Sequence, residues 1–173
     1  MKTSMKLFTL AASALISVSA LAQEGKPWIH DPSNIMECDG KYYTFGTGGG
    51  GLISEDGWNW FSGAVRPGGG AAPDALKIGD RYLIAYSATG GGLGGGHAGR
   101  VLTMWNKTLD PNSPDFEYTE AIEVAASLND EDCDAIDAGL FLDPTTGRLY
   151  CTYGTYFGFI RMVELDPKTG AKV

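Results

Sequence analysis

Short runs of alternating or mainly apolar residues recur along the chain, separated by glycine, aspartate and proline. Such runs, rich in aromatic and β-branched side chains, are typical of β-strands. A helical period is nearly absent, so the pattern predicts an all-β fold. The clearest runs are residues 42–45, 82–86, 101–105, 149–153 and 159–163.

One arrangement of these runs occurs three times. An aspartate (Asp31, Asp74 or Asp137) comes before a first apolar run, a tight turn and a second run. Repeats at intervals of tens of residues indicate a propeller or a solenoid, and radially arranged four-stranded sheets suit such short strands. We therefore predict a β-propeller of which this chain holds about three blades. Because propellers close with about four to eight blades, we expect a fragment of a longer protein. A small β-sandwich is the alternative that the length allows.

Residues 1–22 are predicted to be a signal peptide. Lys2 and Lys6 precede an apolar stretch that ends in the small-x-small site Ala20-Leu21-Ala22. The mature part, residues 23–173, is then the partial propeller domain of an exported protein, periplasmic or extracellular. It has no second hydrophobic run long enough to span a membrane.

Charge and cysteine content restrict the partners. The net charge of −8 argues against a nucleic-acid partner, which would require basic patches. Three cysteines, Cys38, Cys133 and Cys151, allow one disulfide and one free thiol, or buried thiols without a chemical role. Their spacing does not suggest a zinc site.

The aspartates that precede the strands suit the hydrolysis of glycosides. An inverting glycosidase needs one carboxylate to activate water and a second carboxyl group to protonate the leaving oxygen. A further carboxylate can keep that acid protonated through like-charge repulsion. Aspartate-proline pairs can also simply begin turns, and this is our interpretation of Asp110, Asp143 and Asp166.

Three motifs, which together span most of residues 23–173, resemble glycoside hydrolase family 43 and, within it, the arabinanases. They are Trp28-Ile29-His30-Asp31-Pro32-Ser33 followed by residues 40–48, Ala72-Pro73-Asp74 followed by residues 79–87, and Ala135-Ile136-Asp137-Ala138 followed by residues 147–158.

The resemblance implies a five-bladed propeller that hydrolyses arabinose- or xylose-containing polysaccharides with inversion, in the manner of an endo-1,5-α-L-arabinanase. By position, Asp31 would be the general base. Asp137 would be the carboxylate that raises the pKa of the acid and orients it. The acid in this family is a glutamate of a later blade, and Glu164 lies in no matching motif. We therefore expect the acid beyond Val173 and an inactive fragment.

The same resemblance suggests residues that bind the polysaccharide. Asp74 is expected to bond sugar hydroxyls, or to serve only as a corner of its blade. Tyr156 and Trp58 are expected to stack on a sugar, although packing in the core explains them equally well. A calcium ion at the propeller axis is also implied, but the sequence identifies no metal ligands. A non-catalytic carbohydrate-binding propeller is the alternative function.

Two departures from the family pattern affect these expectations. Ala71 stands where an aromatic residue usually precedes the Ala-Pro-Asp motif, so the sequence offers no stacking side chain there. Ala138 stands where proline usually follows the third aspartate. That change can alter the shape of a subsite without removing the carboxylate.

Overall fold

The computed structural model describes residues 24–89, 98–127, 134–154 and 158–173. These ranges contain β-strands and no helix, which confirms the all-β prediction. None of them forms a helix with the length and hydrophobicity that crossing a membrane requires. The strands are β1 (Met36–Cys38), β2 (Lys41–Phe45), β3 (Gly50–Ser54), β4 (Phe61–Val65), β5 (Ala71–Ile78), β6 (Arg81–Thr89), β7 (Arg100–Asn106), β8 (Ile122–Ala126), β9 (Gly139–Leu142), β10 (Leu149–Tyr153) and β11 (Arg161–Leu165).

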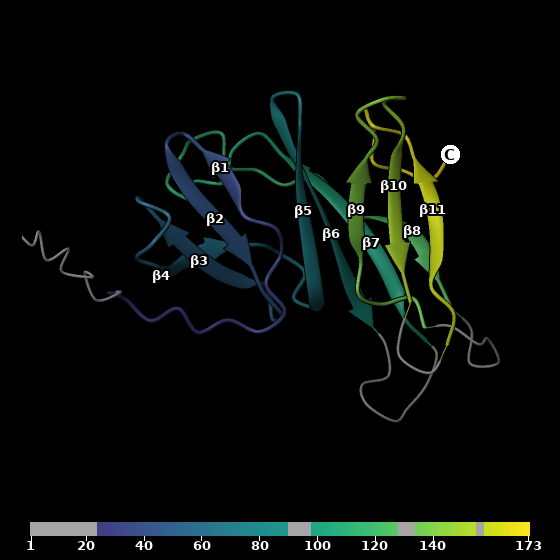
Figure 1. Cartoon of the computed structure of the whole chain (residues 1–173), viewed down its shortest axis with the longest axis horizontal. Helices are drawn as coiled ribbons and strands as arrows, with labels where there is room; N and C mark the ends of the chain where they lie inside the picture. Colours follow the sequence, from purple (N-terminus) through teal and green to yellow (C-terminus); the bar gives the residue numbers. More distant parts are fainter. Residues whose placement is uncertain (1–23, 90–97, 128–133, 155–157) are drawn as a thin grey trace, which may run out of the picture.

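The strands form three antiparallel sheets, each made of strands that are consecutive in the sequence. The orders are β1-β2-β3-β4, β5-β6-β7-β8 and β11-β10-β9. The sheet β5–β8 lies between the other two (Figure 1). The three predicted repeats correspond to the strand pairs β1–β2, β5–β6 and β9–β10. After β11 the chain turns, and Lys172 forms an antiparallel bridge with Leu165.

Strand β6 shows why the middle sheet is apolar on both faces. Successive side chains of a strand point to opposite faces. Tyr82, Ile84 and Tyr86 belong to the core shared with the first sheet, whereas Leu83 and Ala85 belong to the core shared with the third sheet. A strand buried on both faces needs a nearly continuous apolar run, which the sequence provides at this point.

The two ends of the sheets differ. One end, here called the turn end, carries the tight turns between β1 and β2, β5 and β6, and β9 and β10, and it lies at the top of Figure 1. The opposite end, here called the loop end, carries the segments that lead into the first strand of each sheet. Asp31 and Asp137 lie in two of these segments.

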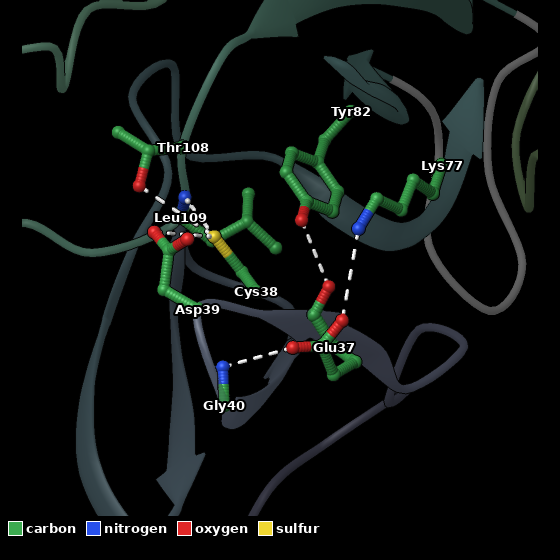
Figure 2. A network of polar contacts seen from close by, with 8 residues as sticks. All are labelled: Glu37, Cys38, Asp39, Gly40, Lys77, Tyr82, Thr108 and Leu109. Atoms are coloured by element: carbon green, nitrogen blue, oxygen red, sulfur yellow. Dashed lines mark hydrogen bonds and ion pairs between the residues drawn. The ribbon is translucent and has the colours of Figure 1, made fainter. Parts of the chain in front are cut away.

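Polar contacts fasten the first two sheets together at the turn end (Figure 2). Tyr82 donates a hydrogen bond to the carbonyl oxygen of Glu37 over 2.8 Å, and the Glu37 carboxylate lies 3.6 Å from Lys77 Nζ. The sulfur of Cys38 accepts a hydrogen bond from the backbone N–H of Leu109. Cys38 is a buried free thiol, and this contact gives it a structural role.

Candidate active site

The two predicted catalytic aspartates, Asp31 and Asp137, lie within electrostatic reach of each other at the loop end. The pKa of Asp137 is raised, chiefly because protein atoms exclude water from part of its carboxyl group, and then by the negative charges of Asp31 and Asp134. The residue nevertheless keeps an exposed surface, so solvent or a ligand can reach it. A carboxyl group of raised pKa beside a second carboxylate is typical of active sites.

The side chain of Asp31 is held through one of its two oxygens. Thr47 donates a hydrogen bond to Asp31 Oδ2 over 2.7 Å, and His30 Nδ1 lies 2.8 Å from the same oxygen. The Thr47 hydroxyl also accepts the backbone N–H of Ala72 over 3.0 Å. Asp31 is thereby tied to the β2–β3 loop and, through it, to the start of β5.

Asp137 is held by its backbone. Its N–H donates to the hydroxyl of Ser87, a residue of β6 that is 2% exposed, over 2.9 Å. Nearby, the buried carboxylate of Asp134 accepts the N–H of Gly99 over 2.8 Å and the hydroxyl of Ser127 over 3.0 Å. These bonds fix the segment that carries Asp137.

Strained backbone gathers at this end. Only four non-glycine residues in the described ranges have a positive φ, and three of them meet at the loop end: Asp31 at 49°, Ala72 at 40° and Asp137 at 55°. Such conformations are unfavourable for residues with a side chain and persist where surrounding contacts impose them, often at functional sites. The strain therefore marks the same place as the carboxylates.

Asp74 joins the three sheets. Its Oδ1 accepts the backbone N–H of Asn34 over 3.2 Å and that of Ala75 over 2.9 Å. Its Oδ2 accepts the backbone N–H of Leu140 over 2.8 Å. Both oxygens are thus engaged with the protein, which is the arrangement expected of a corner residue. A role in binding sugar stays a prediction.

The chain is similar in sequence to proteins named as arabinan-degrading enzymes. No family model matches the chain. It is 29% identical over 153 residues to a probable arabinan endo-1,5-α-L-arabinosidase A of Aspergillus flavus, covering 80% of this chain and 45% of the relative. It is 28% identical over 175 residues to an extracellular exo-α-(1→5)-L-arabinofuranosidase of Cellvibrio japonicus, covering 91% and 49%.

Solved structures agree with these relatives. An exo-1,5-α-L-arabinanase from a bovine ruminal metagenomic library superposes with a TM-score of 0.73 at 30% identity, covering 84% of this chain and 52% of that one. The resemblance to the arabinanases is confirmed. A family 43 endo-arabinanase from Bacillus licheniformis shares the fold, with a TM-score of 0.74 at 24% identity. The chain spans about half the length of the curated relatives it matches.

Of the two predicted sugar-stacking residues, the structure describes only Trp58, and it does not bring Trp58 to the aspartates. Trp58 lies in the β3–β4 connection at the turn end, so the length of the first sheet separates it from Asp31. Tyr156 lies outside the described residues. Thr47 and Ser87 were not predicted from the sequence. The signal available for Thr47 is its position as the only residue with a side chain between Gly46 and Gly51.

Glu164 has the wrong electrostatic setting for a general acid. It forms a bidentate ion pair with Arg148 on the third sheet, and the hydrogen bonds from Arg148 lower its pKa. A general acid needs a raised pKa to hold its proton near neutral pH. This ion pair is consistent with the prediction that Glu164 is not the catalytic acid.

The described residues suggest no metal site. They include no group of three or more His, Cys, Asp or Glu side chains that could hold a metal ion. Cys151, like Cys38, is a buried free thiol, and burial raises its pKa to about 12. Cys133 lies outside the described residues.

Proposed function

We propose that the whole protein is an exported glycoside hydrolase, with residues 1–22 as its signal peptide. Its substrate would be 1,5-linked arabinan, which it would cleave with inversion. The names of the relatives support this substrate, since they include arabinan endo-1,5-α-L-arabinosidases and an extracellular exo-acting arabinofuranosidase. A structure of a Cellvibrio arabinanase complexed with arabinohexaose supports an oligosaccharide as the ligand in this group.

In the proposed reaction, Asp31 takes a proton from a water molecule. The water oxygen then bonds to the anomeric carbon as the bond to the leaving oxygen breaks, and a carboxylic acid protonates that oxygen. The acid would be a glutamate supplied by another part of the whole protein. Asp137, whose own pKa is raised, would keep this acid protonated through like-charge repulsion.

The pairing of Asp31 with Asp137 is the observation that carries the proposal. A general base should accept the proton at an oxygen that is open to solvent. Asp31 is bonded to the protein through Oδ2, which leaves its other oxygen for the water. An orienting carboxylate should sense the charge of the base from a partly water-excluded place, and the raised pKa of Asp137, caused by burial and then by Asp31 and Asp134, supports that role. Aspartates that only began strands would need neither feature.

We also propose that the three sheets are consecutive blades of a five-bladed propeller. The sheets consist of consecutive antiparallel strands and pack face to face. The outer face of the third sheet exposes Phe141 and Met162, which are 55% and 64% exposed. Large exposed apolar side chains on one sheet face are suited to cover by a further blade.

The proposal is tested on the full-length protein with linear arabinan. Release of arabino-oligosaccharides should fall by about 10²–10⁴-fold in Asp31→Asn, because an amide cannot take the proton from water. The released sugar should have the inverted anomeric configuration, which NMR of early products detects. Full activity in the variant would contradict the assignment. Binding of arabino-oligosaccharides without any cleavage by the wild type would favour a non-catalytic carbohydrate-binding propeller.

A further inference from the structure

Two hydrogen-bonding groups converge on one oxygen of Asp31. Thr47 Oγ1 and His30 Nδ1 lie 2.7 and 2.8 Å from Oδ2, whereas Oδ1 has no hydrogen-bond partner among the described residues. The side chain of Asp31 is 41% exposed. One oxygen of the carboxylate is therefore anchored and the other is presented to solvent.

The direction of the Thr47 hydrogen bond is determined by its neighbours. A hydroxyl group has one proton and two acceptor lone pairs. The N–H of Ala72 can only donate and the carboxylate oxygen of Asp31 accepts, so Thr47 is an acceptor toward Ala72 and a donor toward Asp31. Ala72 has a positive φ of 40°, and its N–H points at Thr47 in this conformation.

Thr47 is itself fixed on both sides. Its backbone N–H donates to the carbonyl oxygen of His30 over 2.9 Å, and the next residue, Gly48, donates to Gly70 over 2.8 Å. The first bond ties Thr47 to the residue before Asp31, and the second ties its loop to the segment before β5. The hydroxyl is thus held at a set position relative to the carboxylate.

We propose that Thr47 is the positioning residue of the general base. Its hydroxyl fixes Asp31 Oδ2, so that Oδ1 meets the attacking water at the start of the reaction. This inference rests on the proposed role of Asp31. Positioning of a reacting group contributes to the rate through orientation, and small misplacements reduce the rate strongly.

The test compares Thr47→Val, Thr47→Ser and Thr146→Val in the full-length protein. Valine keeps the shape of threonine but cannot donate, so kcat should fall roughly 10- to 100-fold with KM unchanged, as loss of a hydrogen bond to a charged group implies. Serine restores the donor and should restore most of kcat. Thr146 makes the same kind of bond, to Asp143 over 2.5 Å at the turn end, so Thr146→Val should keep the wild-type kcat.

A crystal structure of Thr47→Val gives a readout that does not depend on cleavage of arabinan. The Asp31 carboxylate should rotate away from its wild-type position while the β2–β3 loop stays in place. An unmoved carboxylate, or a wild-type kcat in Thr47→Val, would overturn the inference. An inactive wild-type protein would instead count against the proposed function, and the position of the carboxylate would then decide the role of Thr47.

Discussion

Asp56 at the turn end and Asp137 at the loop end have opposite electrostatic settings. At the turn end, Asp56 accepts hydrogen bonds from the backbone N–H groups of Asn59 and Trp58, which lower its pKa to about 2. At the loop end, burial and the charge of Asp31 raise the pKa of Asp137. The surroundings therefore favour the ionised form of Asp56 and disfavour the ionised form of Asp137.

The difference separates aspartates that support folding from those available for chemistry. Asp143, at the turn end, accepts bonds from the Thr146 hydroxyl and the Thr145 N–H, and its pKa is lowered as well. Asp31 and Asp137, unlike Asp56 and Asp143, adopt strained backbone conformations. Functional sites commonly reduce the stability of the fold in this way. The contacts of its oxygens therefore distinguish a structural from a catalytic role for an aspartate that precedes a strand.

The largest effect on stability is expected at Asp74, the loop-end aspartate that resembles those of the turn end. Asp74→Ala leaves three backbone N–H groups without their acceptor, so the free energy of unfolding should fall by about 3 kcal/mol in urea titrations. Asp74→Asn keeps one acceptor oxygen and should lose about half as much. A variant with wild-type stability that fails only to bind arabino-oligosaccharides would show that Asp74 is a substrate ligand instead.

A smaller effect, with a defined pH dependence, is expected at Asp56. Because its pKa is about 2 in the folded protein against 3.8 for the free group, its ionised form stabilises the fold above about pH 4, and this contribution is lost as the pH falls toward 2. Thermal unfolding should therefore show a lower Tm for Asp56→Asn at pH 6 and a converging Tm near pH 2. A gap that widens on acidification would contradict this account.

The strands that the sequence predicts well are those with aromatic, period-two patterns between clear turns. Residues 149–153 match β10, and residues 42–45 lie in β2. The prediction at residues 159–163 was displaced, because β11 begins at Arg161, and the exposed Phe159 and Ile160 precede it. Apolar residues alone did not indicate that boundary.

The outer strands β4 and β8 were not predicted. β4 is mostly exposed and contains a glycine, and only Ala64 is buried on it. β8 likewise buries only Val124. Edge strands contact the core on few positions, so their sequences carry a weak pattern. Their pairing is set by the neighbouring strands β3 and β7, which a local pattern cannot reveal.

The site was predictable in its carboxylates but not in its supports. The resemblance of motifs indicated Asp31 and Asp137, and the structure brings them to one end. Thr47 and Ser87 reach these aspartates across 16 and 50 residues of sequence. Contacts over such separations depend on how the sheets pack, so the local sequence gave no signal for Ser87 and marked Thr47 only by its place in a run of glycines.

Substitution of Asp137 by asparagine tests the central contrast most directly. A group whose pKa is raised by folding adds stability below its unfolded pKa, and this contribution is lost as the pH rises through the folded value. Asp137→Asn removes the unfavourable charge, so in the full-length protein its Tm should exceed that of the wild type at pH 7, and the two should converge in acid. Hydrolysis of arabinan should meanwhile fall on the order of 10²-fold or more. A lower Tm at pH 7 together with unchanged hydrolysis would contradict the account.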